Sequence, residues 1–177
     1  MVQTAENAVA GSRDYFQLFG LTPAFDVDVA DLAARYRVLQ QKFHPDRFSA
    51  VSAAEARAAA QVSAEINAGY NILRDPVQRA GFMLERRGKD KQALERTPVA
   101  GEFLMQQIEL REAVQALNPD DQEGRNQLQR AIDQLFDDAL QAFKQHIDSD
   151  DLDAAGTAWV HLLYVNKLRQ EAGAVKD

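Results

Sequence analysis

Hydrophobic side chains recur along this chain at the spacing of helices. Between residues 28 and 43 the apolar positions are Leu32, Tyr36, Leu39 and Phe43, at intervals of four, three and four. An α-helix turns once every 3.6 residues, so these four side chains share one helix face. Strands would show sustained alternation of apolar and polar residues or an Asn-Gly hairpin turn, and the sequence has neither. The pattern therefore predicts an all-α protein.

Capping residues and helix-breaking residues set the expected ends of the helices. Ser52 and Glu55 have the spacing of a capping box, in which each side chain bonds to the backbone amide of the other residue. Asp28, Ser12 and Thr97 are candidate caps for three other helices. The expected helices cover residues 14–21, 28–43, 52–75, 76–87, 98–117, 128–147 and 152–168.

Charge is unevenly distributed along the chain and indicates two domains. Residues 1–96 carry 13 basic and 12 acidic residues, a net charge of +1, whereas residues 97–177 carry 7 basic and 15 acidic residues, a net charge of −8. Short connections between the long helices of the acidic half predict a three-helix bundle. The predicted segments are a flexible tail at 1–12, a first domain at 13–88, a linker at 89–97 and the bundle at 98–177.

Composition excludes several classes of protein. The chain has no cysteine, which excludes disulfides, thiolate metal sites and a cysteine nucleophile. Its net charge of −7 has the opposite sign to that of a general nucleic-acid binder. The first residues lack the features of a signal peptide, and no apolar run approaches the roughly 20 residues that span a bilayer. We therefore expect a cytoplasmic protein that binds neither nucleic acid nor membranes.

The segment His44-Pro45-Asp46 lies between two predicted antiparallel helices. Proline fixes its own backbone dihedral and restricts the residue before it, and the aspartate offers an exposed anion that suits an arginine on a partner. Arg37 and Lys42 lie off the apolar stripe of the preceding helix. They would form a positive surface beside the loop, and such a surface steers an acidic partner.

A basic helix, this tripeptide and a long following helix together resemble a J-domain, the module that recruits DnaK-type ATPase chaperones. The likeness extends to segments 14–21, 36–46 and 66–84, which look like HscB, the J-type co-chaperone family of iron–sulfur cluster assembly. Segment 103–112 is similar to the scaffold-binding helix of that family. The resemblance covers nearly the whole chain and implies a J-domain packed on a three-helix bundle. The absence of the cysteine-rich zinc module of eukaryotic members favours the bacterial type.

The resemblance implies a mechanism in two parts that needs no cofactor or metal. The J-domain would dock on the ATPase chaperone HscA and stimulate its ATP hydrolysis, and the bundle would bind the scaffold protein IscU and deliver it to HscA. The residues that match the chaperone-binding loop and helix are His44, Pro45, Asp46, Tyr36, Arg37 and Lys42. The residues that match the scaffold-binding site are Leu104, Met105, Ile108, Glu109, Glu112 and Tyr164. Ala116 stands near a position where the family often has another acid.

The residues of segment 98–117 support a binding surface independently of this resemblance. The segment carries two apolar stripes, whereas a bundle needs one. The stripe that suits the core consists of Phe103, Leu110, Val114 and Leu117. The second consists of Leu104 and Ile108, with Met105 beside them and Glu112 at its end. Methionine and leucine inside a charged rim suit a recognition surface. The alternative is a helix buried on two sides, for instance against the first domain.

Two other functions fit parts of the sequence. An enzyme could use His44 and Asp46 as an acid–base pair, but nothing adjacent supplies a nucleophile or an oxyanion site, so we expect no catalytic activity. A J-domain co-chaperone with a different client would differ only in its bundle. Neither His146 nor His161 has a second histidine at helical spacing, which favours packing or surface roles over a metal site. Trp159 is expected in the core.

Overall fold

The computed structural model describes residues 14–43, 52–118 and 120–174. The regular secondary structure in these ranges is entirely helical, which confirms the prediction of an all-α protein. The chain divides into two compact units, Met1–Phe82 and Met83–Asp177. The division falls inside a helix rather than in the polar stretch that the sequence suggests as a linker.

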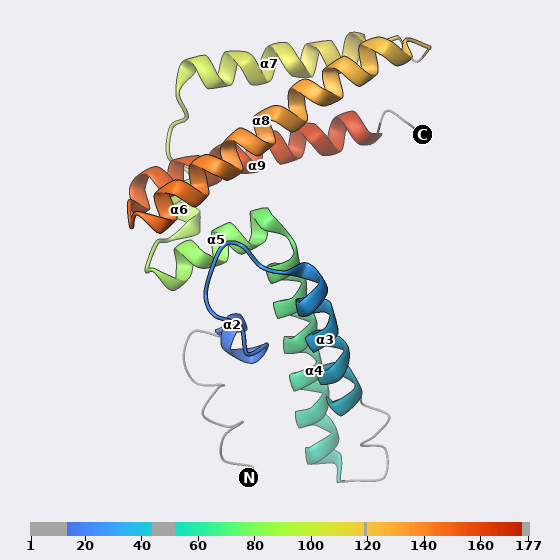
Figure 1. Ribbon diagram of the computed structural model, residues 1–177, viewed down its shortest axis with the longest axis vertical. Coiled ribbons are helices and arrows are strands. Elements are labelled where there is room, and N and C mark those ends of the chain that lie inside the picture. The colour runs from blue at the N-terminus through green and yellow to red at the C-terminus, as the bar shows by residue number, and fades with distance from the viewer. Residues whose placement is uncertain (1–13, 44–51, 119, 175–177) are drawn as a thin grey trace. The chain divides into compact units, whose positions relative to one another are not determined.

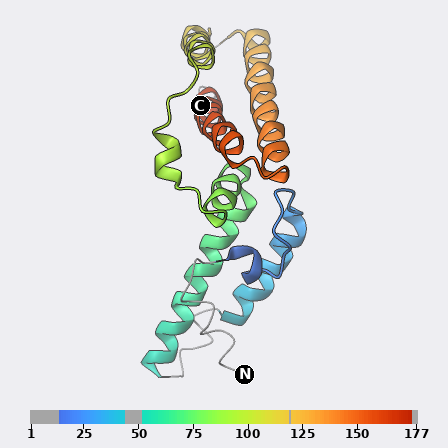
Figure 2. The same ribbon diagram turned by 90° about the vertical axis from the view of Figure 1, so that its left-hand side faces the viewer.

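Two antiparallel helices form the body of the first unit. Its helices are α2 (Tyr15–Leu18), α3 (Val29–Phe43), α4 (Ala53–Arg74) and the first part of α5 (Pro76–Arg86). Helices α3 and α4 lie side by side, and α2 packs against α4 (Figures 1 and 2). Gly69 permits the approach of α2, because a Cβ atom there would lie 2.6 Å from a ring carbon of Tyr15.

Aromatic side chains of α2 fill the core of the first unit. Tyr15 and Phe16 are both buried, and their ring centroids lie 5.0 Å and 5.9 Å from that of Phe82. A helix of four residues is too short to be stable on its own, since helix nucleation is unfavourable. The burial of these rings, each of which removes roughly 150–250 Å² from water, therefore holds α2 in place.

The structure confirms the two caps predicted for the helical hairpin. The Asp28 carboxylate accepts hydrogen bonds from the backbone amides of Ala30 and Asp31, at 2.8 Å and 3.1 Å. Ser52 and Glu55 form the capping box: the Glu55 amide donates to Ser52 Oγ at 3.3 Å, and the Ser52 amide donates to the Glu55 carboxylate at 3.1 Å. The start of α4 is therefore set by local side-chain chemistry.

The first helix is shorter than the sequence suggests. Asp14 is the N-cap of α2, with its carboxylate 3.1 Å from the amide of Phe16, whereas we expected Asp14 to be the first residue of a helix reaching Leu21. Gly20 ends the turn with a φ of 63°, a left-handed conformation that glycine adopts without strain. The other candidate cap, Ser12, and the tail at 1–12 lie outside the described residues.

The second unit is built on a long antiparallel pair of helices. Its elements are the end of α5, α6 (Lys91–Glu95), α7 (Gly101–Ala116), α8 (Gln122–Asp148) and α9 (Leu152–Ala174). A tight turn joins α8 to α9, with Asp150 at a φ of 61°, and α7 lies along this pair (Figure 1). Trp159 is 3% exposed and Phe143 is fully buried, which places them in the core, as the sequence predicts for Trp159.

The start of α7 differs from the prediction. We expected Thr97 to cap a helix from residue 98, but α7 begins at Gly101. The Thr97 hydroxyl instead donates to the carbonyl of Ala93 at 3.3 Å, so it closes α6 rather than opening α7. Ala100 precedes α7 and makes no side-chain capping bond. Helix α7 therefore starts without the local support that the sequence suggested.

Three further differences lie in the second unit. The predicted linker at 89–97 contains α6, which the Asp90 side chain caps through the amides of Gln92 and Ala93. The helical spacing of α8 predicts one apolar stripe, and Phe136 lies outside it yet is buried at 5% exposure. The predicted stripe consists of Leu128, Ile132, Leu135, Ala139, Phe143 and Ile147. Helix α9 continues to Ala174, beyond the predicted end at Leu168.

Two further properties bear on function. The described helices include none with the length and hydrophobicity needed to cross a bilayer. Within residues 14–43, 52–118 and 120–174 there is no cluster of three or more histidine, aspartate or glutamate side chains placed to hold a metal ion.

Candidate docking surfaces

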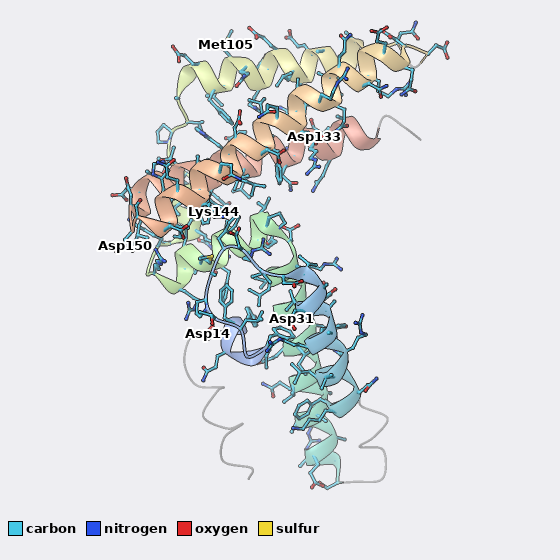
Figure 3. The ribbon with its side chains drawn as sticks, in the orientation of Figure 1. Asp14, Asp31, Met105, Asp133, Lys144 and Asp150 are labelled. Carbon is cyan, nitrogen blue, oxygen red and sulfur yellow. The ribbon has the colours of Figure 1, made fainter. Side chains whose placement is uncertain are left out.

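Helix α7 presents apolar side chains to solvent on one face. Leu104, Met105 and Ile108 are 36%, 57% and 48% exposed. The spacing of Leu104 and Ile108 puts them one turn apart on the same side of the helix. Figure 3 shows Met105 on the edge of α7 that faces away from α8 and α9. Large apolar side chains at this exposure, gathered on one helix, are typical of an interaction surface.

The opposite face of α7 packs on the bundle. Val114 is buried, and the other residues predicted for the core stripe, Phe103, Leu110 and Leu117, are half-buried. Gln107 is also buried, at 4% exposure, and sequence reasoning missed it because glutamine is seldom a core residue. Helix α7 is therefore apolar on two sides, and only one of them contacts α8 and α9.

Tyr164 of α9 joins this apolar surface from a second helix. Its side chain is 39% exposed, and its ring contacts Phe103 of α7 edge-on, with centroids 6.1 Å apart and planes at 90°. The described chain of the second unit exposes four large apolar side chains. They are Leu104, Met105, Ile108 and Tyr164, and we call them the apolar patch. They coincide with the four apolar residues predicted for scaffold binding.

Acidic side chains flank the apolar patch on α7. Glu109 and Glu112, both predicted for the site, are exposed on α7, and so is Glu102 near the start of this helix. Arg111, the single basic residue of α7, is held by Glu171 of α9 through a 2.9 Å ion pair. Because that cation is partly neutralised, the α7 side of the patch is negative. It fits a partner with apolar side chains and a basic rim.

The first unit exposes basic side chains along α3. Arg37 and Lys42, both predicted for chaperone binding, are exposed, and Val38 between them is 65% exposed. Arg35 is exposed as well, but it bonds to the Asp31 carboxylate at 2.8 Å and to the carbonyl of Phe19 at 3.0 Å. Arg35 therefore ties α3 to the segment after α2, while Arg37 and Lys42 form the basic part of the surface.

Tyr36, the third predicted docking residue of α3, also bonds to α4. Its hydroxyl donates to the side-chain oxygen of Asn67 at 2.8 Å, and its ring stacks on that of Tyr70 with centroids 4.1 Å apart. The amide nitrogen of Gln40 donates to the same oxygen of Asn67 at 2.6 Å. Sequence reasoning missed Asn67, although a polar residue one turn before Tyr70 on the α3-facing side of α4 could have indicated it.

The tripeptide His44-Pro45-Asp46 lies outside the described residues. What the structure gives are the elements on either side of it. Helix α3 ends at Phe43, with the Lys42 ammonium 5.3 Å from the Phe43 ring centroid, and the Ser52 capping box begins α4. The roles of the tripeptide therefore stay predictions.

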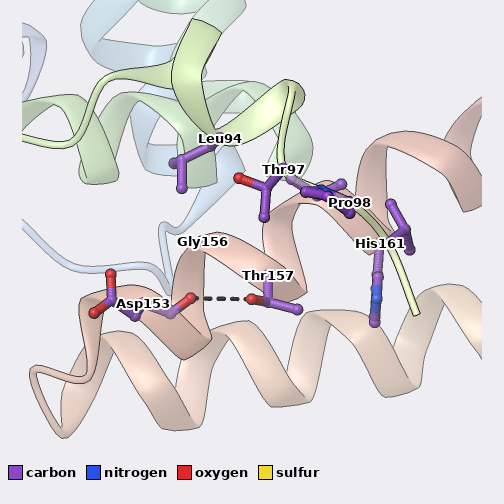
Figure 4. A pocket seen from close by; sticks show the side chains of 9 residues that line it. Leu94, Thr97, Pro98, Asp153, Gly156, Thr157 and His161 are labelled. Atoms are coloured by element: carbon purple, nitrogen blue, oxygen red, sulfur yellow. Dashed lines mark hydrogen bonds between the residues drawn. The ribbon is translucent and has the colours of Figure 1, made fainter.

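A pocket that the sequence did not indicate lies between α9 and the segment from α6 to α7 (Figure 4). Its volume is about 170 Å³, and its walls include Leu94, Pro98 and His161. The Thr157 hydroxyl at its floor donates to the Asp153 carbonyl at 3.2 Å. Burial lowers the pKa of His161, because the charged imidazolium loses solvation there.

Comparisons with known proteins agree with this geometry. Residues 99–173 match the family described as the HSCB C-terminal oligomerisation domain. A co-chaperone protein HscB homolog of Neisseria meningitidis is 38% identical over 158 residues, which cover 89% of this chain and 95% of that protein. The homolog of Cupriavidus taiwanensis is 38% identical over 175 residues, covering 93% and 94%. The structure of chaperone HscB from Vibrio cholerae has a TM-score of 0.85 at 30% identity, over 93% of this chain and 98% of that one.

Proposed function

This chain belongs to the HscB family of co-chaperones, and we propose that it binds the iron–sulfur scaffold IscU, delivers it to the chaperone HscA and stimulates the ATPase of HscA. The relatives are named co-chaperones, a non-enzymatic role. The sequence has no P-loop, so ATP would be hydrolysed by HscA rather than by this chain. We further propose that it acts in the cytoplasm, without nucleic acid or membrane as a partner.

The observation that carries this proposal is the apolar patch on α7 and α9. A bundle that served only as a structural support would need one apolar face on α7, and a second face with three exposed apolar residues would be a liability for aggregation. The acidic side chains on its α7 side favour a scaffold with a basic rim over a second copy of this chain packed α7 against α7, because that packing would bring like charges together. We assign IscU binding to the patch together with Glu109 and Glu112.

The second part of the proposal concerns α3 and the segment after it. Arg37 and Lys42 are exposed cations that would steer an acidic surface of HscA to this unit. His44, Pro45 and Asp46 would then contact the chaperone, with Asp46 accepting hydrogen bonds from an arginine. This part should weaken as the salt concentration rises, because exposed charges are screened over about 10 Å at 0.1 M ionic strength.

Two variants separate the two parts. The Leu104→Ala/Met105→Ala/Ile108→Ala variant should lose retention of IscU in a pull-down, but should still raise the basal ATPase rate of HscA. Asp46→Asn should retain IscU and lose stimulation of HscA, with an unchanged circular dichroism spectrum. Val29→Ala, which shortens another exposed apolar side chain, is the matched control. It should retain IscU and stimulate HscA as the wild type does. Equal retention of IscU by the triple variant and the wild type would refute the assignment of the site.

A co-chaperone with a different client is the second candidate, because the same J-domain surface would serve it. In that case the wild-type chain would stimulate HscA but would not retain IscU. Stimulation that rises further when IscU is added together with the chain would support the first candidate, since it requires both surfaces at once.

A further inference from the structure

The start of α7 lacks local support, although the apolar patch begins there. Ala100 makes no side-chain capping bond, and the first helical residue is Gly101, which has no side chain to pack. Helix termini without caps fray unless tertiary contacts hold them. The position of Leu104 and Met105 therefore depends on what holds the first turns of α7 against α9.

Phe103 makes the ordered contact at this end of the helix. Its ring lies parallel to the imidazole of His161 on α9, with centroids 3.9 Å apart and planes 10° apart. The same ring meets Tyr164, one turn further along α9, edge-on at 6.1 Å. Phe103 is thus flanked by two aromatic side chains of α9, and one of these belongs to the apolar patch.

Other contacts between α7 and α9 are less specific. Gln107 follows one turn after Phe103 and is buried, but none of the described residues bonds to its amide nitrogen or oxygen. Arg111 pairs with Glu171 at 2.9 Å, with side chains 39% and 37% exposed. Exposed ion pairs contribute little to fixing a helix, whereas aromatic pairs have a preferred geometry. The orientation of the first turns of α7 therefore rests mainly on the aromatic contacts.

We propose that the stacked pair of Phe103 and His161 is the positioning element of the docking surface: it fixes the α7 part of the apolar patch beside Tyr164 of α9. The inference rests on the proposed function in one respect: the spacing between the α7 side chains of the patch and Tyr164 would set the affinity for IscU. The planar ring of His161 matters for this role. Its Nε2 atom, which is buried and has no hydrogen-bond partner among the described residues, does not.

The test replaces His161 in the full-length chain by two apolar residues that both remove Nε2. His161→Phe keeps a planar ring for Phe103 to stack on, and His161→Leu fills the space without one. We expect His161→Phe to bind IscU as tightly as wild type, and His161→Leu to bind about 2- to 12-fold more weakly, the range given by one aromatic contact. The thermal unfolding midpoint of His161→Phe should be equal to or above that of wild type, because this variant keeps the stack and removes the unbonded Nε2. The midpoint of His161→Leu should stay well above the temperature of the binding assay, so that both variants are compared as folded proteins. His146→Leu, the same substitution on α8, is the control and should not alter affinity.

A second measurement does not depend on IscU. The chain has four tyrosines, so the ring signals of Tyr164 can be assigned in NMR spectra with a Tyr164→Phe variant. They should move in His161→Leu and stay near the wild-type position in His161→Phe. If wild type failed to bind IscU while these shifts appeared as expected, the proposed function would fail and the positioning role would stand.

Two results would overturn the inference. The first is equal affinity of His161→Leu and His161→Phe for IscU, whether both are strong or both are weak, because the planar ring would then be irrelevant. The second is a Tyr164 ring signal that does not respond to His161→Leu, because the stack would then have no influence on the α9 side of the patch.

Discussion

The hydroxyl of Tyr36 lies 2.8 Å from the side-chain oxygen of Asn67 and donates a hydrogen bond to it, which links the two long helices of the first unit. Gln40 donates to the same oxygen at 2.6 Å, so one asparagine on α4 holds two residues of α3. Tyr36 is one of the residues that the sequence predicts to dock on HscA. The bond indicates that it also stabilises the hairpin that presents Arg37 and Lys42.

Tyr36→Phe should lower the free energy of unfolding by about 0.5–1.5 kcal/mol, the net value of a typical hydrogen bond. Asn67→Ala should cost more, because it leaves both Tyr36 and Gln40 without their acceptor. Urea denaturation of both variants and of the double variant measures the coupling between them. Strictly additive effects would show that the bond does not form in solution.

The capping box at the start of α4 predicts how much stability the first unit loses when Ser52 is replaced. Ser52→Ala should destabilise the first unit by about 1 kcal/mol, because the Glu55 amide loses its acceptor. Hydrogen bonds from Ser52 lower the pKa of the exposed Glu55 carboxyl below its ordinary value of about 4.5. The ionised carboxylate therefore stabilises the fold fully above about pH 4.5. This stabilisation is lost as the pH falls through the lowered pKa of the folded state. Chemical denaturation at pH 7 and at acidic pH should show the Ser52→Ala effect shrinking in acid. An effect that grew in acid would contradict this explanation.

Local features of the fold were predictable from the sequence, and contacts between distant segments were not. The caps at Asp28 and Ser52 involve residues two or three positions apart, so residue types alone indicate them. The start of α7 was predicted three residues too early, because a threonine can close one helix or open the next, and Thr97 closes α6.

The apolar patch was likewise predictable only where it depends on the pattern of a single segment. Its α7 residues follow from a second apolar stripe, which is a property of one segment. The pair of Phe103 and His161 joins positions 58 residues apart in the sequence, and the burial of Gln107 depends on how α7 lies on α8 and α9. No helical periodicity indicates either feature, because both depend on the packing of separate helices.

Gln107 gives a prediction of increased stability. Its amide nitrogen and oxygen are buried and find no partner among the described residues, and an unsatisfied buried amide costs about 1–3 kcal/mol. Gln107→Leu should therefore raise the free energy of unfolding by about 1–2 kcal/mol in urea denaturation. Gln106→Leu is the matched control on the exposed face next to it and should change the stability little. A loss of stability in Gln107→Leu would show that the amide is bonded in solution.

The burial of His161 leads to a prediction of how the stability of the second unit depends on pH. Burial lowers the pKa of His161 in the folded state below its ordinary value of about 6.5. Asp153 also lines the pocket, and the hydrogen bond from Lys89 lowers the pKa of its carboxyl. Below pH 6.5 the unfolded chain therefore binds a proton that the folded chain binds only at lower pH. The stability associated with His161 is complete above about pH 6.5 and declines as the pH falls towards the folded-state pKa.

Unfolding midpoints of wild type and His161→Phe between pH 8 and pH 5 test this dependence. Other groups titrate in both proteins, so the difference between the two curves isolates the imidazole. The difference should be constant above about pH 7 and should shift in favour of His161→Phe as the pH falls below 6.5. A difference that stayed flat would mean that the imidazole is solvated in both states. A shift in favour of wild type would mean that His161 gains a carboxylate partner when it is protonated.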